Sequence, residues 1–353
     1  NCISVIGTNG KYSTIQALFS ILKEANYKCN VYTSPHIRKI NERFIFNNKQ
    51  ISDNELVLLL EEIEEINNSQ PITFFEILTA AFLFKSSKYP KNINLIETGL
   101  FHRFDATNIL KKNLGNVITS IGLDHLDWLP KNKKTVKKIV FEKTSCLLNS
   151  KTIIAKQNSS KIKDYIKKNI TKNKSPKLFY GEDFSYLIKN DKFIFKDRFG
   201  KLNLPIPNLK ADFQLENIST AIATLRVLKN LNIDKNHIKK GIIKIDNIAR
   251  FQEIKSGKLK NLVKDNSIFI DGSHNPLGAK TLTKHLQNFK CNKHIIFGMM
   301  TNKNHHNFIK YFKNFSSLTA IDIPNQPNAI KGIDLKNKLK NISKIKNKNT
   351  VED

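Results

Sequence analysis

The chain has 353 residues, of which 40% are hydrophobic and 25% are charged, so its length suits roughly two or three globular domains. The sequence contains no apolar run of about 18 residues, which excludes a membrane-spanning helix from the expected elements. The net charge of +29 comes from Lys that is spread evenly with Asn and Ile, without an aromatic-interleaved basic motif, so we expect solvated basic faces and no nucleic-acid partner. Four scattered cysteines without a C-x-x-C pair indicate neither a zinc site nor a disulfide scaffold, and they favour the cytoplasm: Cys2, Cys29, Cys146 and Cys291.

Strands and helices are expected to alternate along the chain. In the first half, the expected strands are 2–6, 30–33, 93–97 and 116–121, and the expected helices are 11–26, 54–66 and 73–86. An exposed Lys- and Asn-rich stretch follows at 161–177, then a helix at 212–230, strands at 251–254, 267–270 and 294–297, and a helix at 277–286. This alternation predicts an α/β protein with a P-loop-type parallel sheet, followed by a smaller Rossmann-like α/β domain.

A glycine loop directly follows the first expected strand, and it runs from Gly7 through Thr8, Asn9, Gly10, Lys11, Tyr12 and Ser13 to Thr14. Glycines let backbone N–H groups face an anion, the helix N-terminus favours negative charge, and a lysine neutralises phosphate. The loop is a shortened variant of the regular phosphate-loop pattern, because Val5 stands where that pattern has its first glycine. The sequence therefore predicts nucleotide-phosphate binding here, and a plain glycine turn with a solvated lysine is the alternative.

Polar patterns also follow other expected strands, where ligands gather in parallel sheets. They comprise Tyr32-Thr33-Ser34-Pro35-His36 with Asn41-Glu42-Arg43, Glu97-Thr98-Gly99-Leu100 running to Arg103–Asn108, Gly122-Leu123-Asp124-His125, and Glu142-Lys143. Each pattern alone is typical of helix caps and structural side chains as well as of active sites.

In this order, the patterns resemble those of the folylpolyglutamate synthase/dihydrofolate synthase family, a branch of the Mur ligase superfamily. Further matching segments are Thr73-Phe74-Phe75-Glu76, Gln214-Leu215-Glu216-Asn217, Ala249-Arg250-Phe251 and Asp271-Gly272-Ser273-His274-Asn275-Pro276. The resemblance extends over nearly the whole chain. It implies an ATP-binding domain over residues 1–247 and a glutamate-ligase domain over residues 248–353. It also implies that the full-length protein has further residues before residue 1 and after residue 353.

The resemblance implies an ATP-dependent ligase that phosphorylates a carboxylate of dihydropteroate or folate, after which L-glutamate attacks the acyl phosphate. ATP and Mg²⁺ are the implied cofactors. The implied catalytic residues are Lys11, His125, Lys143 and His274, and the implied metal ligands are Ser13, Ser34, Glu97, His125 and Lys143 as a carbamate. The ATP-binding set comprises Gly7, Thr8, Asn9, Gly10, Lys11, Ser13, Thr14, Gln214, Asn217, Arg250, Asp271 and His274. The folate-binding set comprises Thr73, Phe74, Phe75, Arg103, Asp105 and Thr107.

The chain departs from the family pattern at two places. Tyr12 replaces the glycine after Lys11, and Phe101-His102 replace two glycines beside the expected substrate. The sequence leaves open whether dihydropteroate, folate or both accept glutamate. The alternatives are another Mur-type ligase of cell-wall synthesis, a degenerate nucleotide-binding protein without activity, and a basic nucleic-acid binder. We expect a monomer whose partners are small-molecule substrates, with neither nucleic acid nor a membrane.

Overall fold

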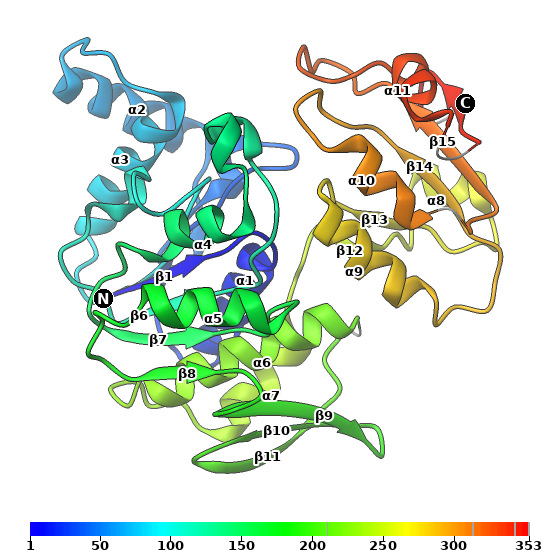
Figure 1. The fold of residues 1–353 in the computed structure, drawn as a ribbon. Coiled ribbons are helices and arrows are strands. Elements are labelled where there is room, and N and C mark those ends of the chain that lie inside the picture. Colours follow the sequence, from blue (N-terminus) through cyan, green and yellow to red (C-terminus); the bar gives the residue numbers. More distant parts are fainter. Residues whose placement is uncertain (210, 313, 342–343, 352–353) are drawn as a thin grey trace. The chain divides into compact units, whose positions relative to one another are not determined.

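The computed structural model describes residues 1–209, 211–312, 314–341 and 344–351, and Figure 1 shows its helices and strands. The chain forms two compact units. The first comprises residues 1–121 and 135–247, and the second comprises residues 122–134 and 248–353. Residues 122–134 therefore group with the second unit, whereas the sequence pattern had assigned them to the first domain. Among the described residues, no helix has the length and apolar character needed to cross a membrane.

An eight-stranded sheet with the order β4-β3-β2-β5-β1-β6-β7-β8 organises the first unit. Its strands are β1 (Cys2–Ile6), β2 (Cys29–Tyr32), β3 (Phe44–Phe46), β4 (Lys49–Gln50), β5 (Ile93–Glu97), β6 (Gly115–Ile118), β7 (Lys151–Ile154) and β8 (Lys177–Phe179). β1 pairs in parallel with β5 on one side and with β6 on the other. At one edge of the sheet, β3 pairs antiparallel with β2 and with β4. β1 lies in the middle of the sheet and is buried along its whole length. This burial on both faces explains why its sequence is almost entirely apolar.

Helices cover both faces of this sheet because its strands point alternate side chains to opposite faces. Ile3 and Val5 pack into one core cluster with the first set of helices. Tyr32 and Ile96 pack into a second cluster with another pair of helices. The first set comprises α1 (Lys11–Glu24), α6 (Asp212–Val227) and α7 (Lys235–Ile243), and the pair comprises α2 (Asp53–Asn67) and α3 (Phe74–Ser87). α4 (Val136–Thr144) packs against α5 (Ser160–Asn169).

Three antiparallel strands form a small second sheet in the same unit: β9 (Phe184–Lys189), β10 (Lys192–Asp197) and β11 (Gly200–Pro205). Arg226 of α6 donates to both carboxylate oxygens of Asp197, at 2.7 and 3.0 Å, and this ion pair fixes β10 to the helix. The sequence analysis had not identified this sheet. It had also treated 161–177 as an exposed stretch, whereas Ile162 and Ile166 of α5 are buried.

The second unit is a smaller α/β unit. Its strands β14 (His294–Phe297), β15 (Ser317–Ile321) and β16 (Lys346–Lys348) form a parallel sheet, and β12 (Arg250–Glu253) pairs antiparallel with β13 (Phe269–Asp271). Its helices are α8 (Lys258–Val263), α9 (Pro276–Leu286), α10 (His305–Ile309) and α11 (Gly332–Leu339). The core of this unit joins α9, α10 and α11 to β14 and β15. The α/β class and the order of a large parallel sheet before a smaller unit are therefore confirmed.

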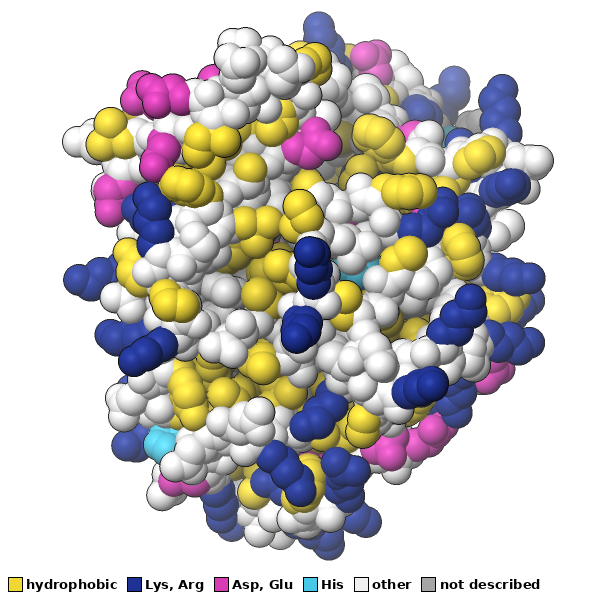
Figure 2. Space-filling model, turned by 90° about the vertical axis from the view of Figure 1, so that its left-hand side faces the viewer, with side chains coloured by type: hydrophobic (Ala, Val, Ile, Leu, Met, Phe, Trp, Pro, Cys, Tyr) yellow, Lys and Arg dark blue, Asp and Glu magenta, His cyan; other side chains and the backbone are white. Residues whose placement is uncertain are grey.

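Single-turn 3₁₀ segments connect several of these elements: η1 (Ile40–Arg43), η2 (Ala106–Ile109), η3 (Leu126–Trp128), η4 (Lys131–Lys133) and η5 (Lys310–Phe312). On the face shown in Figure 2, Lys and Arg side chains are scattered among other side chains instead of forming one band. This distribution agrees with solvated basic faces.

Gly241 marks the closest approach of α7 to α1. A Cβ added at Gly241 would lie 2.6 Å from the Cα of Ile21 and 2.9 Å from its backbone nitrogen, and the Gly241 carbonyl accepts a hydrogen bond from Ser20. Alanine normally favours a helix interior over glycine by about 1 kcal/mol. Here we expect Gly241→Ala to lower the free energy of unfolding by about 1–3 kcal/mol, because backbone atoms must separate.

Urea denaturation followed by circular dichroism measures this difference. Lys240→Ala is the matched control, since Lys240 is an exposed neighbour on the same helix. We expect Lys240→Ala to be neutral or slightly stabilising. A Gly241→Ala variant as stable as this control would contradict the close packing of α7 on α1.

Candidate active site

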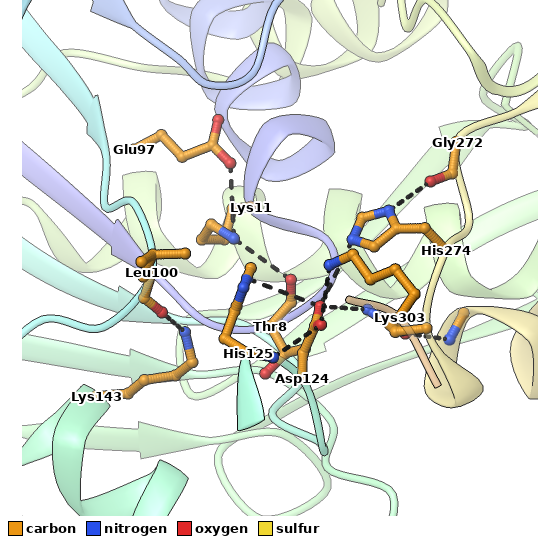
Figure 3. A network of polar contacts seen from close by, with 12 residues as sticks. Thr8, Lys11, Glu97, Leu100, Asp124, His125, Lys143, Gly272, His274 and Lys303 are labelled. Carbon is orange, nitrogen blue, oxygen red and sulfur yellow. Dashed lines mark hydrogen bonds and ion pairs between the residues drawn. The ribbon is translucent and has the colours of Figure 1, made fainter. Parts of the chain in front are cut away.

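The glycine loop connects β1 to α1, as the sequence pattern predicts. The backbone N–H groups of Thr8 and Asn9 both donate to the Ser120 carbonyl, at 2.9 and 3.1 Å, just beyond the neighbouring strand β6. Lys11 begins α1, and its ammonium donates to the Thr8 carbonyl at 3.3 Å (Figure 3). These bonds fold the loop back against the sheet and place the lysine at the start of the helix.

The N-cap residue of α1 is a glycine. Gly10 occupies this position with φ of 89°, and it has no side chain with which to cap the helix. A Cβ on Gly10 would clash with the side-chain oxygen of Asn217, so both the backbone angle and the close approach of α6 require glycine. Asn217 in turn donates to Gln214 at 3.4 Å. A helix N-terminus that carries a lysine and has an amide side chain beside it is a favourable place for phosphate.

Hydroxyls of the first helical turn lie inside the first unit. Ser13 is buried, and its hydroxyl contacts the side chain of Asn247, which donates to it at 3.0 Å. The buried hydroxyl of Thr14 has no hydrogen-bond partner among the described residues. The side chain of Asn247 thus orients the Ser13 hydroxyl, and the sequence analysis had not singled out this asparagine.

Glu97 contacts both the start of α1, directly after the glycine loop, and the segment after β2. One carboxylate oxygen of this buried residue lies 3.7 Å from the Lys11 ammonium, and the other accepts the Ser34 backbone N–H at 3.1 Å. β5 ends at Glu97 and pairs with both β1 and β2, so parallel pairing brings these three strand ends to one edge. The structure therefore brings together Lys11, Ser34 and Glu97.

Lys143 lies beside the loop that follows β5. Its side chain is buried, its ammonium donates to the Leu100 carbonyl at 2.5 Å, and the Phe101 ring centre is 5.4 Å from it. His102 is buried next in the chain, and neither ring nitrogen has a hydrogen-bond partner in the described part of the chain. Burial, together with the charge of Lys143, lowers the pKa of His102 to about 4, so this imidazole is neutral at pH 7.

The expected folate residues Arg103, Asp105 and Thr73 each make polar contacts with other residues of the first unit. Arg103 pairs with Glu142 through two bonds of 2.8 and 3.2 Å. Asp105 accepts from the Gly99 N–H and from Thr107, and burial raises its pKa despite these bonds. Thr73 caps α3 in a reciprocal pair with Glu76.

Two aromatic rings at the start of α3 differ in exposure. The Phe74 ring is 59% exposed, and the Arg43 guanidinium lies 5.5 Å from its centre. The Phe75 ring packs against Tyr32, with 5.9 Å between centroids. An exposed ring beside a guanidinium leaves one aromatic face for a flat ligand.

In the second unit, a buried aspartate organises the predicted histidines. Asp124 accepts from Asn275 at 2.8 Å and from the Lys303 ammonium at 3.2 Å, and its carboxylate lies 3.5 Å from Nε2 of His274 (Figure 3). His125 is 3.8 Å from the same carboxylate. Burial alone would raise the pKa of Asp124, but the His274 hydrogen bond and the charges of His125 and Lys303 hold this pKa well below its usual range.

The other predicted residues of this unit lie on β12 and β13. Asp271 accepts the backbone N–H groups of Phe251 and Ser273, at 2.8 and 2.9 Å. Arg250 pairs with Asp271 in the strand register and donates to the Ala249 carbonyl. His274 follows β13, with its Nδ1 2.8 Å from the Gly272 carbonyl. The sequence analysis had not assigned Asp124 or Lys303 to the site, although Lys303 follows a strand as the other polar patterns do.

The donor set of the first unit fits a hard cation in part. Glu97 supplies a carboxylate, and Ser13 and Ser34 supply hydroxyls, which are oxygen ligands suited to Mg²⁺. Within the described residues, no group of three His, Cys, Asp or Glu side chains can hold a metal ion alone. A Mg²⁺ ion on this unit would therefore need further oxygen ligands, such as nucleotide phosphates or a carbamate.

Comparisons with known proteins give one consistent result, although no protein-family model matches the chain. The dihydrofolate synthase/folylpolyglutamate synthase of Escherichia coli is 31% identical over 308 residues, which are 85% of this chain and 67% of that protein. The enzyme of the same name from Bacillus subtilis is 29% identical over 376 residues, which are 99% of this chain and 81% of that protein.

Solved structures agree with these relatives. E. coli FolC in complex with ADP superposes with a TM-score of 0.85 at 27% identity, over 99% of this chain and 81% of that one. E. coli FolC in complex with DHPP and ADP gives a TM-score of 0.83 over 99% and 80%. A bifunctional folylpolyglutamate synthase/dihydrofolate synthase with Mn, AMPPNP and L-glutamate bound shares the fold, at 23% identity and a TM-score of 0.83 over 100% and 81%.

We expect Asp124→Asn to destabilise the protein by about 3 kcal/mol at pH 7, because it leaves the Lys303 ammonium without its carboxylate partner. The free energy of unfolding in urea, compared with that of the unmutated chain, measures this loss. The pKa of this carboxyl group is lower in the folded protein than in the unfolded chain, where it is about 4. The carboxylate therefore contributes its full stabilisation above about pH 4, and this contribution decreases as the pH falls below that value. The difference between the two proteins should therefore shrink below about pH 4.

Asp127→Asn is the control for Asp124→Asn. It removes the same charge from the same segment, but the Asp127 side chain is 56% exposed and lies 4.0 Å from Lys134. Its effect should stay within about 0.5 kcal/mol. Equal stability of the two variants would contradict the organising part assigned to Asp124.

Proposed function

Since the chain belongs to the dihydrofolate synthase/folylpolyglutamate synthase family, we propose that it is a bifunctional ATP-dependent ligase that joins L-glutamate to dihydropteroate and to reduced folate. The observation that carries this proposal is the position of Lys11 at a helix start whose N-cap residue is glycine, with Glu97 3.7 Å from the Lys11 ammonium. Lysine and helix dipole suit a triphosphate, and the carboxylate suits its cation. The coverage and identity of the E. coli relative place the chain in a family with this activity by name.

In the first unit, the proposed phosphate contacts come from the start of α1. The N–H groups of its first turn and the Lys11 ammonium would bind the β- and γ-phosphates of ATP. Asn217, which lies against Gly10, and Gln214, which accepts a hydrogen bond from Asn217, would contact the nucleotide. Lys11 would neutralise charge as the substrate carboxylate attacks the γ-phosphorus, giving an acyl phosphate and ADP.

The proposed metal ligands are Ser13, Ser34, Glu97, His125 and Lys143 as a carbamate. When bound, Mg²⁺ supplies Lewis-acid stabilisation of the charge that develops on the transferred phosphoryl group. Glu97 holds its carboxylate ready for a cation because β5 and the Ser34 N–H fix its position. Ser13 is similarly fixed through Asn247.

In the second unit, the proposed nucleotide contacts are Arg250 to phosphate, Asp271 to ribose, and His274 to phosphate or to the incoming amino acid. The planar guanidinium of Arg250 suits phosphate oxygens. Asp124 and the Gly272 carbonyl fix both ring nitrogens of His274, so that imidazole is oriented before any substrate binds. This is a positioning function for Asp124, which touches no substrate in the proposal.

The proposed folate contacts are Thr73, Phe74, Phe75, Arg103, Asp105 and Thr107. The exposed ring of Phe74 offers a stacking face for a pterin, while Asp105 offers a buried carboxyl group for polar recognition. Another Mur-type ligase of cell-wall synthesis is disfavoured by these segments. A degenerate nucleotide binder is disfavoured because each unit keeps a buried charge that is costly to bury: Lys143 in the first unit and Asp124 in the second.

The proposal describes a monomer in the cytoplasm that acts on small molecules. Its four cysteines are free, with Cys2 and Cys29 buried, which suits a reducing compartment. The molecules it acts on would be ATP, L-glutamate and the pteroate or folate acceptor, and no nucleic acid or membrane partner is proposed.

The test of this function is product formation from ATP, Mg²⁺, L-glutamate and 7,8-dihydropteroate, followed by mass spectrometry for dihydrofolate. We expect product with the unmutated chain and at least a roughly 100-fold lower rate with Lys11→Ala, because phosphate charge is then left unneutralised. Lys23→Ala, which changes an exposed lysine of the same helix, should leave the rate unchanged. No product with either dihydropteroate or tetrahydrofolate as acceptor would favour a nucleotide binder without ligase activity.

Tyr12 is the second point to test, since it replaces the glycine of the family pattern. It lies in the first turn of α1 and is partly exposed, so we expect the helix to accommodate it. Tyr12→Gly should keep or raise kcat/KM for ATP in the same assay. A loss of about tenfold or more would show that the tyrosine itself contributes to ATP use.

A further inference from the structure

Phe251, the residue after Arg250, belongs to a cluster of four rings that contact one another in the second unit. Its ring stacks on that of Phe269, with 4.6 Å between the centroids and 10° between the planes. The His285 ring stands edge-on to Phe251 at 4.7 Å, and the Phe289 ring lies edge-on at 6.0 Å. The rings come from β12, β13, α9 and the residues just after α9, so three separate segments restrict the position of the Phe251 ring.

The backbone on both sides of Arg250 has an unfavourable conformation. Ala249 has φ of 50° and Phe251 has φ of 56°, in a left-handed region that residues other than glycine seldom adopt. The pairing of β12 with β13 also changes register between Arg250 and Gln252, because β12 contains one extra residue there. Such a bulge redirects a side chain, and backbone conformations of this kind persist only where surrounding contacts hold them.

Hydrogen bonds and the ring cluster hold different parts of this bulge. The Ala249 N–H donates to the Gln252 side chain at 2.9 Å, and the Phe251 N–H donates to the Asp271 carboxylate at 2.8 Å. The Ala249 carbonyl accepts the Gly272 N–H at 2.9 Å. These bonds hold peptide groups, whereas the φ of Phe251 determines the direction of its side chain. Because the cluster fixes that side chain, it opposes a return of Phe251 to an ordinary φ.

The bulge determines where the Arg250 guanidinium lies. Its Nη1 donates to the Ala249 carbonyl at 3.0 Å. A Cβ added at Gly272 would lie 2.5 Å from the same nitrogen, so the guanidinium lies directly against Gly272. Gly272 lies between Asp271 and His274 in the chain, and these two residues are the other proposed nucleotide contacts of this unit. The guanidinium is therefore held beside them before any nucleotide binds.

We propose that Phe251 is a positioning residue that acts through Arg250: its packed ring holds the bulge of β12 and thereby orients the guanidinium for the phosphate of the bound nucleotide. The inference rests on the proposed function of Arg250 as a phosphate ligand, and Phe251 itself touches no substrate. Without the ring, the backbone on which Arg250 sits is released. The arginine must then be ordered when the phosphate binds, and this ordering weakens the binding.

The experiment measures the binding of AMPPNP with Mg²⁺ to the full chain by isothermal titration calorimetry, below the unfolding temperature of each variant. We expect Arg250→Ala to weaken binding about tenfold or more, as for a lost hydrogen bond to a charged group. Phe251→Ala should weaken binding at least about threefold, because the guanidinium is present but is no longer held. Phe251→Tyr, which keeps the stacked ring, should bind AMPPNP as the unmutated chain does.

A double-mutant cycle separates positioning from packing. If Phe251 acts through Arg250, adding Phe251→Ala to Arg250→Ala should weaken AMPPNP binding no further, whereas the effects of two independent residues would multiply. Multiplied losses in the double variant would overturn the proposal. An affinity of Phe251→Ala equal to that of the unmutated chain would overturn it as well.

Phe315→Ala is the matched control in the same unit. Its ring is partly buried against the core of that unit, with 5.4 Å between its centroid and that of Phe312. We expect this variant to lower the free energy of unfolding, as Phe251→Ala does, without a change in AMPPNP affinity. Equal losses of affinity in the two variants would show that general loosening of the unit is the cause, and the proposal would then be wrong.

Phe251→Leu keeps the proposal testable if the alanine variant does not fold. It keeps an apolar side chain but removes the flat stacking face, so ¹⁵N relaxation of the Arg250 Nε should show a more mobile side chain than in the unmutated chain or in Phe251→Tyr. An equally rigid Arg250 would contradict the proposal. Ligase activity without the coupling between Phe251 and Arg250 would refute this inference alone, whereas the expected coupling without ligase activity would refute only the proposed function.

Discussion

The parallel pairing of β1 with β5 and β6 is the constraint on which the candidate site of the first unit depends. Val5 pairs with Glu97 and Ile6 with Ile118 in the register of these strands, so the glycine loop starts beside both neighbouring strand ends. The Ser120 carbonyl then fixes the loop through Thr8 and Asn9. A shift of this register by one residue would turn Glu97 to the other face of the sheet and away from Lys11.

Each unit contains a buried carboxylate that is surrounded by several hydrogen-bond donors or cationic side chains. Glu97 is buried with a lysine and a backbone N–H as partners, and Asp124 is buried with a lysine, an asparagine and histidines. A carboxylate buried with several donors stays ionised and holds its partners in one geometry. Removing one partner of such a group is destabilising, but a buried ion pair as a whole is often no more stable than apolar residues of the same size. The presence of these pairs is therefore better explained by the chemistry that they orient.

The loop after β5 shows how one chain can modify a common site. The family pattern has two glycines where this chain has Phe101 and His102. The Phe101 ring centre lies 5.4 Å from the Lys143 ammonium, and the His102 side chain is buried. A pair of glycines adds no side chains to such a loop, whereas these two residues add two rings. Its fixed position follows from Glu142, whose carbonyl accepts two consecutive backbone N–H groups of the loop.

The sequence by itself determined the elements with strong local signals. The strands 93–97 and 294–297 were predicted with their observed bounds. The glycine loop lies between β1 and α1 as expected. The ordered motifs also identified the family, which the relatives confirm. These features depend on residues close together in the chain, such as glycines, apolar runs and helix periodicity, so local pattern is sufficient.

Only the tertiary structure decided which distant residues share a contact. The sheet β9–β11 was missed because its apolar side chains, such as Phe193 and Phe195, are buried by packing into the core of the first unit, with partners far away in the chain. Asp124 accepts hydrogen bonds from Asn275 and Lys303, and Lys143 donates one to the Leu100 carbonyl. These contacts join segments that are separated by about 40 to 180 residues. No local pattern encodes such pairings, because burial and ion pairing depend on the folded neighbours and not on the residues adjacent in sequence.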